Sequence, residues 1–184
     1  VKDRLGSLID TKTFLPYRFE KHQEEGSYRN DETTLFERNK NIALTFDAED
    51  RATNPKGTSI AVPSDVQDAL SVFYDLRREK LKVGKSVFIN VNADGKNYRI
   101  EVKVLRKEKL GSQKTIVVEP VLKQVDLGGI LRKKGGIYIW LTDDEKRIPV
   151  LIKARVVIGS LTLMLVDKKL GQRMGRKEGL KKQN

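Results

Sequence analysis

Hydrophobic and polar side chains alternate along much of the chain. The alternation is clearest in four stretches, Val87–Asn92, Tyr98–Val104, Ile148–Arg155 and Leu161–Val166. Since successive side chains of a strand point to opposite faces of a sheet, each stretch predicts a strand with one buried and one wetter face. Such strands are typical of antiparallel sheets. We therefore expect a mainly antiparallel all-β protein.

Short polar connections separate the predicted strands. Asp94-Gly95 lies between two alternating stretches and is the strongest hairpin signal in the chain. Similar connections occur at Asn39–Asn41, Leu110–Ser112 and Asp143–Lys146. Because short connections favour pairing between consecutive strands, the predicted topology is a meander. About nine or ten strands are expected, and a sheet of that size should curve strongly or become barrel-like.

One segment has a helical period instead. Apolar residues recur at helical spacing within Asp65–Arg78, which predicts a single amphipathic helix over that range. Ser64 is the expected N-cap, and Gln67 falls at the position of a capping box. The preceding stretch, Glu49–Ala61, is polar and predicts a long loop.

Two stretches are apolar at consecutive positions, so both faces of the strand would be apolar. They are Gly136–Leu141 and Ser160–Val166. One explanation is burial of the second face beneath the helix. The other is a ligand cavity or an apolar docking patch. The pattern leaves both explanations open.

Part of the positive charge of the chain lies at its C-terminal end. The 184 residues carry a formal net charge of +12. We expect a single β domain over residues 1–166 and a basic, disordered tail over residues 167–184, with the basic residues Lys168, Lys169, Arg173, Arg176, Lys177, Lys181 and Lys182. This tail indicates an anionic partner, such as a lipid surface, an acidic polymer or nucleic acid, or else a solvated surface.

The sequence offers little for catalysis. Without cysteine, disulfides, thiolate metal sites and cysteine nucleophiles are excluded. The single histidine, His22, has no catalytic partner nearby in the sequence and is expected to be a surface or pairing residue. Asp143 and Asp144 are expected to form a turn rather than bind calcium. We therefore predict no enzymatic activity, no metal and no cofactor.

The sequence leaves two other functions to consider. A single-stranded nucleic-acid-binding module would need aromatic side chains beside basic ones on a sheet face, for which Tyr98, Tyr138 and Trp140 are the candidates. A hydrolase of envelope polymers would need paired carboxylates, and no positive sign of such a pair is found.

Several motifs resemble a known bacterial family, DUF3108, whose function is unknown. They are Trp140–Val150, Asp68–Arg77 followed by Val83-Gly84, Val118–Pro120 and Ile158–Ser160. The resemblance runs from about Arg4 to Val166. It implies a mainly antiparallel, barrel-like fold and, through an export signal upstream, a place in the periplasm or at the outer-membrane periphery. No catalytic residue is implied.

The start of the chain bears on that localisation. The chain begins at Val1 with a charged segment that does not resemble a signal peptide, and the family usually has further strand sequence before this region. We therefore expect a processed form or a fragment lacking its first strands.

Together these observations predict a non-enzymatic binding protein of the bacterial cell envelope. Its ligand would be an apolar or amphipathic envelope molecule, such as a lipid or glycolipid, or an envelope protein. The expected ligand-binding residues are Tyr74, Arg77, Tyr138, Trp140 and Arg147. The basic tail would hold the protein near an anionic surface.

Overall fold

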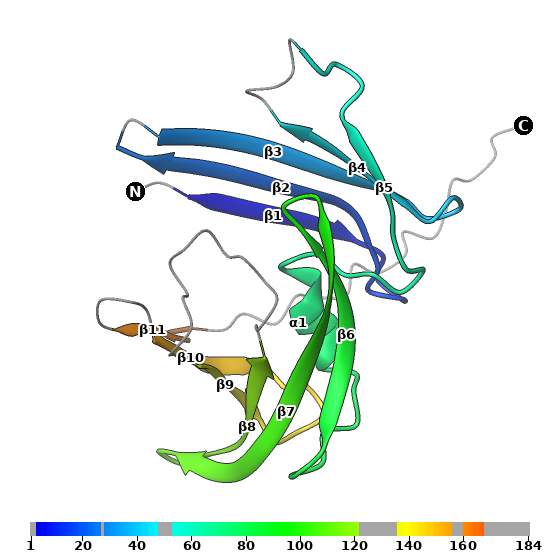
Figure 1. The fold of residues 1–184 in the computed structure, drawn as a ribbon. Helices are drawn as coiled ribbons and strands as arrows, with labels where there is room; N and C mark the ends of the chain where they lie inside the picture. The colour runs from blue at the N-terminus through cyan, green and yellow to red at the C-terminus, as the bar shows by residue number, and fades with distance from the viewer. Residues whose placement is uncertain (1–2, 27, 48–52, 122–135, 156–159, 168–184) are drawn as a thin grey trace, which may run out of the picture.

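The residues that the structure describes form two antiparallel sheets and a short helix (Figure 1). The computed structural model describes residues 3–26, 28–47, 53–121, 136–155 and 160–167. The first sheet contains β1 (Arg4–Ile9), β2 (Pro16–Glu25), β3 (Tyr28–Glu37), β4 (Ile42–Asp47) and β5 (Thr58–Ala61). The second contains β6 (Ser86–Ala93), β7 (Lys96–Leu110), β8 (Gln113–Val121), β9 (Ile137–Thr142), β10 (Pro149–Arg155) and β11 (Ser160–Met164).

Both sheets are meanders, as the short connections predict. Neighbouring strands follow one another along the chain in each sheet, and every strand pair is antiparallel. At the β6–β7 hairpin, Asp94 and Gly95 have φ angles of 49° and 66°. Two positive φ angles are what a type I′ hairpin turn requires, and they explain the Asp-Gly pair. The mainly antiparallel fold class is thus confirmed.

The described strands do not close into a barrel, and they form two sheets rather than one curved sheet. The chain leaves the first sheet after β5 and crosses to the second through residues 62–85. Gln67 makes an isolated parallel bridge to Val91 of β6, and the Asn97 side chain donates to the Ala61 carbonyl at 2.7 Å. The two sheets are therefore linked beside β5 and β6 by sparse contacts instead of a continuous ladder.

The structure has eleven described strands, more than the nine or ten expected. The difference lies partly in the stretch Glu49–Ala61, which we predicted to be a loop. Its last four residues form β5, which pairs with β4 from Thr45↔Thr58 to Ile42↔Ala61. Ile60 packs against the hydrophobic core of the first sheet, and this contact holds a short polar stretch in strand conformation.

Helix α1 spans Ser71–Leu76 and is much shorter than the predicted Asp65–Arg78. Residues before it are held elsewhere, since the Gln67 backbone bonds to the backbone of Asn90 and Asn92 on β6. The predicted cap at Ser64 is therefore wrong. Asp68 supplies the cap: its Oδ1 accepts from the backbone N–H groups of Leu70 and Ser71, both at 2.7 Å, and the Ser71 hydroxyl accepts from the Asp68 N–H at 2.8 Å.

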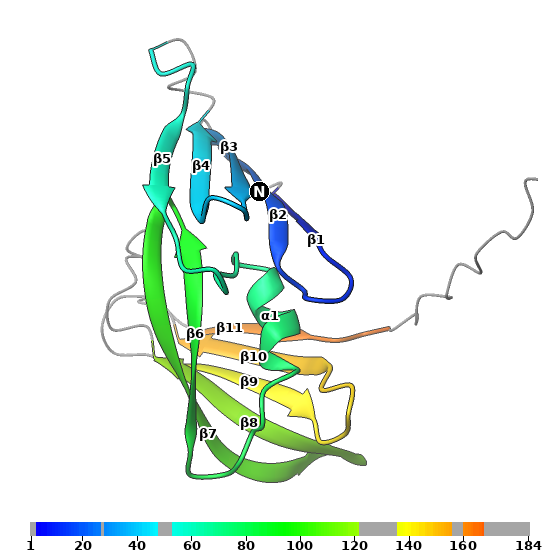
Figure 2. The ribbon, with the colours of Figure 1, turned by 90° about the vertical axis from the view of Figure 1, so that its right-hand side faces the viewer.

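Within the described ranges, the buried apolar side chains form three clusters. The largest lies between α1 and one face of the second sheet, and Figure 2 shows α1 between the two sheets. A second cluster lies on the first sheet around Phe36 and Ala43. The third contains Val117, Trp140 and Leu151 on the other face of the second sheet. Strand β9 is consequently buried on both faces, which accounts for the doubly apolar stretch Gly136–Leu141.

Candidate functional site

Three of the predicted ligand-binding residues meet where α1 ends. The Arg77 Nε donates to the Lys146 carbonyl at 2.5 Å, and the Arg147 guanidinium donates to the carbonyls of Arg77 and Glu79. The guanidinium of Arg77 also lies 5.5 Å from the centre of the Tyr74 ring. These bonds fasten the end of α1 to the β9–β10 turn, so both arginines have a structural part in the fold.

The β9–β10 turn itself forms as the sequence predicts. Asp144 Oδ1 accepts from the Thr142 hydroxyl at 2.6 Å and from the backbone N–H groups of Lys146 and Arg147, each at 3.0 Å. The register then shifts between Pro149 and Leu151, where proline cannot donate a hydrogen bond to the ladder.

The other two predicted residues lie on the opposite face of the second sheet. Trp140 is 7% exposed and its indole N–H donates to Glu108, while Lys153 Nζ lies 5.6 Å from the ring centre. The Tyr138 and Trp140 rings are 6.4 Å apart. Bonds from Arg106 and then Trp140 lower the pKa of the Glu108 carboxyl. Trp140 is thus a core residue with a satisfied N–H, and its ring face is not open to a stacked base.

The predicted basic residues of the tail, Lys168, Lys169, Arg173, Arg176, Lys177, Lys181 and Lys182, lie outside the described residues. His22 is described, and its expected pairing role is confirmed. Its Nδ1 lies 2.6 Å from Asp31 Oδ1, across neighbouring strands β2 and β3. Within the described ranges, no group of three or more histidine or acidic side chains is arranged to hold a metal ion.

Strand β11 lies at the edge of the second sheet in the described residues (Figure 2), and exposed apolar side chains occur along it and just after it. Leu161 and Leu163 are about half exposed, and Met164 and Val166 are 66% and 96% exposed. Burial under the helix therefore does not explain the doubly apolar stretch Ser160–Val166. Isolated exposed apolar side chains are ordinary, whereas a contiguous run indicates an interaction surface.

The pairing of β11 with β10 shows which backbone groups of β11 point toward the edge of the sheet. Leu165 N donates to the Val150 carbonyl at 3.0 Å, and Leu163 lies opposite Ile152. Hydrogen-bonded and non-hydrogen-bonded pairs alternate in an antiparallel ladder. The backbone groups of Thr162 and Met164 therefore point away from β10. Among the described residues, this edge thus offers both exposed apolar side chains and backbone groups without a partner strand.

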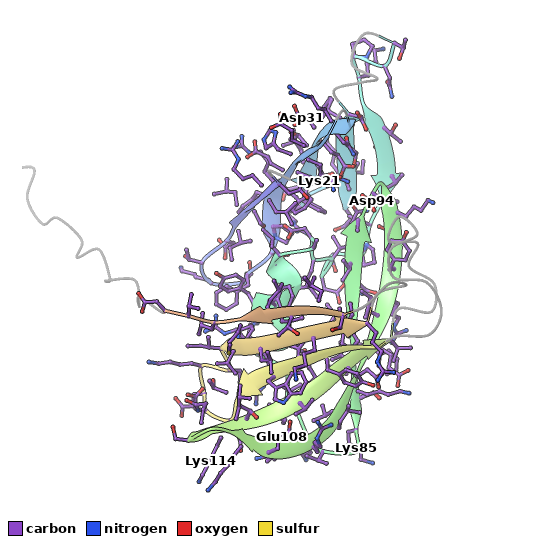
Figure 3. The ribbon with its side chains drawn as sticks, turned by 90° about the vertical axis from the view of Figure 1, so that its left-hand side faces the viewer. Lys21, Asp31, Lys85, Asp94, Glu108 and Lys114 are labelled. Carbon is purple, nitrogen blue, oxygen red and sulfur yellow. The ribbon has the colours of Figure 1, made fainter. Side chains whose placement is uncertain are left out.

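A polar cluster bridges the first sheet and the β6–β7 hairpin. Figure 3 shows Lys21 beside Asp94, and Lys21 Nζ lies 2.6 Å from Asp94 Oδ1 and 3.4 Å from Glu32 Oε2. Burial, together with the charge of Asp94, raises the pKa of Glu32 despite the attraction of Lys21. Burial alone would lower the pKa of Lys21, but its two carboxylate partners raise it overall. This cluster is one of the links between the two sheets, and the sequence did not predict it because its members are far apart along the chain.

A half-buried carboxyl on α1 has an unfavourable environment. Burial, followed by the charge of Glu79, raises the pKa of Asp75 above its ordinary value of 3.8, and the nearby charge of Asp65 adds to the effect. The positive charge of Arg78, whose Nη1 lies 3.9 Å from Asp75 Oδ1, opposes this rise of the pKa. Ionisation of Asp75 therefore lowers the stability of the folded protein relative to the unfolded chain.

We expect Asp75→Asn to stabilise the protein at neutral pH. A raised folded-state pKa means that the folded protein binds the proton more tightly, so wild-type stability falls as pH rises from the ordinary value of 3.8 through the folded-state pKa. Asparagine cannot ionise, so the variant should lack this loss. Urea unfolding of both proteins at neutral and at acidic pH measures the difference in their free energies of unfolding. A gain that persists at pH values below 3.8 would contradict this origin.

The geometry defines a mainly antiparallel β protein with two open sheets and an exposed apolar edge. The chain belongs to the DUF3108 family of proteins of unknown function, whose model matches residues 1–166. Neither a curated protein nor a solved structure matches the chain. Among the described residues, no helix is both long and apolar enough to cross a membrane.

Proposed function

We propose that this protein is a non-enzymatic binding protein that docks on an anionic lipid surface through the exposed end of β11. The observation that carries the proposal is the series of exposed apolar side chains between Leu161 and Val166, at the edge of the second sheet as the described residues form it. We place this surface in the periplasm or at the outer-membrane periphery, as the family resemblance implies.

The apolar side chains supply the insertion energy. Moving a large apolar side chain out of water is worth about 1.5–3 kcal/mol when burial is complete. Met164 and Val166 are the most exposed of the run, so they have the most to gain from contact with acyl chains. Several such side chains together give a binding energy that one alone would not.

Positive charge favours a lipid surface that is anionic. Lys153 and Arg155 lie on β10, next to β11, and the sequence after Asp167 contains seven basic residues and one acidic residue, Glu178. Each well-placed basic residue adds about 1 kcal/mol of attraction to such a surface. A second copy of this chain would bring the same excess of positive charge, which disfavours self-association at this edge.

The first test is binding to lipid vesicles by sedimentation. We expect the full chain to bind vesicles that contain phosphatidylglycerol, and to bind phosphatidylcholine vesicles more weakly by at least about tenfold. Removing Lys168–Asn184 should weaken binding to the anionic vesicles and reduce its salt dependence, since a basic segment acts through screened electrostatics. Equal binding to both vesicles, or none to either, would contradict the proposal.

A further inference from the structure

A cavity of about 340 Å³ lies between α1, β6 and the turn that joins β1 to β2. Its apolar walls include Leu15, Phe88 and Ile89. The polar residues that line it are Thr13, Ser64, Asp65, Gln67, Asp75, Arg78 and Glu79. The volume falls at the lower end of the range of small-molecule sites, which is about 300–1,000 Å³.

Gln67 stands out among these residues because it is 1% exposed and incompletely bonded. Its Oε1 is buried and accepts no hydrogen bond from the part of the chain that the structure describes. Its Nε2 makes a long 3.5 Å contact with the Asp65 carbonyl. A buried acceptor without a donor destabilises the fold, so a ligand that donates a hydrogen bond here would be favoured.

The charges around the cavity are not balanced. Three of the lining residues, Asp65, Asp75 and Glu79, carry a carboxyl group, and one, Arg78, carries a guanidinium, whose Nη1 lies 3.9 Å from Asp75 Oδ1. Arg78 is engaged at the rim: its Nη1 donates to the Thr13 carbonyl at 2.6 Å, and its guanidinium lies 5.6 Å from the centre of the Phe14 ring. The cavity therefore combines negative charge with an acceptor that lacks a donor.

We propose that this cavity binds a small organic ammonium ion, with its N–H groups directed to Gln67 Oε1, Asp75 and Glu79 and its alkyl part against Leu15 and Phe88. A primary ammonium has three donors and no acceptor, which matches a lining of oxygen acceptors. The apolar walls favour an alkylammonium over inorganic ammonium. This site is separate from β11 and does not depend on lipid docking.

The test is a ¹H–¹⁵N NMR titration of the full chain with n-butylammonium. We expect saturable shifts of the Gln67 side-chain amide and of the backbone amides of Asp75 and Phe88, with a Kd of about 1 mM or tighter. 1-Butanol, which has the same chain and no charge, should bind at least about tenfold more weakly, a difference of about 1.4 kcal/mol.

Matched variants separate the site from general electrostatics. Asp75→Asn, which should fold because it removes a destabilising charge, is expected to weaken n-butylammonium binding by at least about tenfold. Asp31→Asn removes the same charge from an exposed position on β3 and should leave binding unchanged. Absence of saturable shifts up to about 10 mM, equal shifts with 1-butanol, or equal weakening by both variants would overturn the proposal.

Discussion

Replacing Asp68 with alanine should lower the free energy of unfolding by roughly 3–5 kcal/mol. Asp68 is fully buried and joins three parts of the fold. Its Oδ2 accepts from the Ser7 hydroxyl of β1 at 2.5 Å, and its Oδ1 caps α1 through two backbone N–H groups. Burial lowers the pKa of Arg38, and the negative charge of Asp68 opposes that decrease.

Alanine would leave several of these partners without an acceptor. Loss of a helix cap alone costs about 0.5–2 kcal/mol. The Ser7 hydroxyl would lose its acceptor, and the half-buried guanidinium of Arg38 would lose a nearby negative charge. Urea unfolding, followed by circular dichroism, measures the change in the free energy of unfolding.

Two control variants separate the contributions. Asp68→Asn keeps an oxygen for the helix cap and an amide that can donate to Ser7, so it should cost less than alanine. Asp65→Ala removes an exposed carboxylate whose Oδ1 accepts one bond from the Asn90 side chain, at 2.8 Å, and should change stability by no more than about 1 kcal/mol. A loss below about 1 kcal/mol for Asp68→Ala would show that Asp68 does not hold these elements together.

The second large effect is expected on lipid binding. The double variant Met164→Glu with Val166→Glu should reduce binding to phosphatidylglycerol vesicles by at least about 100-fold, since two insertions worth about 1.5–3 kcal/mol each are lost and negative charge is added. Both side chains are largely exposed, so the fold should tolerate the change. Vesicle sedimentation at fixed salt measures the loss.

The change of net charge needs its own control. The double variant Ser59→Glu with Gln113→Glu alters the net charge by the same amount at exposed positions on β5 and β8, and should retain most of the binding. If both double variants lose binding equally, the apolar end of β11 has no specific part in it.

A third variant distinguishes lipid docking from the addition of a partner strand at the same edge. Thr162→Pro removes a backbone N–H that points away from β10, and proline is tolerated on edge strands. It leaves the apolar side chains in place, so vesicle binding should persist. If Thr162→Pro abolishes vesicle binding, the backbone groups at the edge of β11, rather than its side chains, make the contact.

Much of the fold could be predicted from local patterns. Asp94-Gly95 and Asp144 predicted the positions of two hairpin turns, because turn geometry depends on the residues within the turn. Alternation likewise located most strands of the second sheet. These features depend on neighbours in sequence, and the structure confirms them.

The remaining features depend on contacts between distant residues. The helix begins late because Gln67 bonds to β6, and β5 forms because it pairs with β4. Division into two sheets could not be inferred from strand count alone. In the sequence, both β9 and β11 have apolar residues at consecutive positions, so that both faces of each strand are apolar. Only the structure shows that β9 is buried and that β11 is exposed. The cavity at Gln67 had no signal in the sequence.

The most direct test of the docking proposal is the environment of residue 164 on a vesicle. The chain has no cysteine, so Met164→Cys gives a unique position for an environment-sensitive fluorophore, and Ser59→Cys on β5 gives the control. On phosphatidylglycerol vesicles we predict a blue-shifted, brighter emission for the label at 164 and unchanged emission at 59. Bound protein whose label at 164 keeps the emission of the free protein would contradict docking through β11.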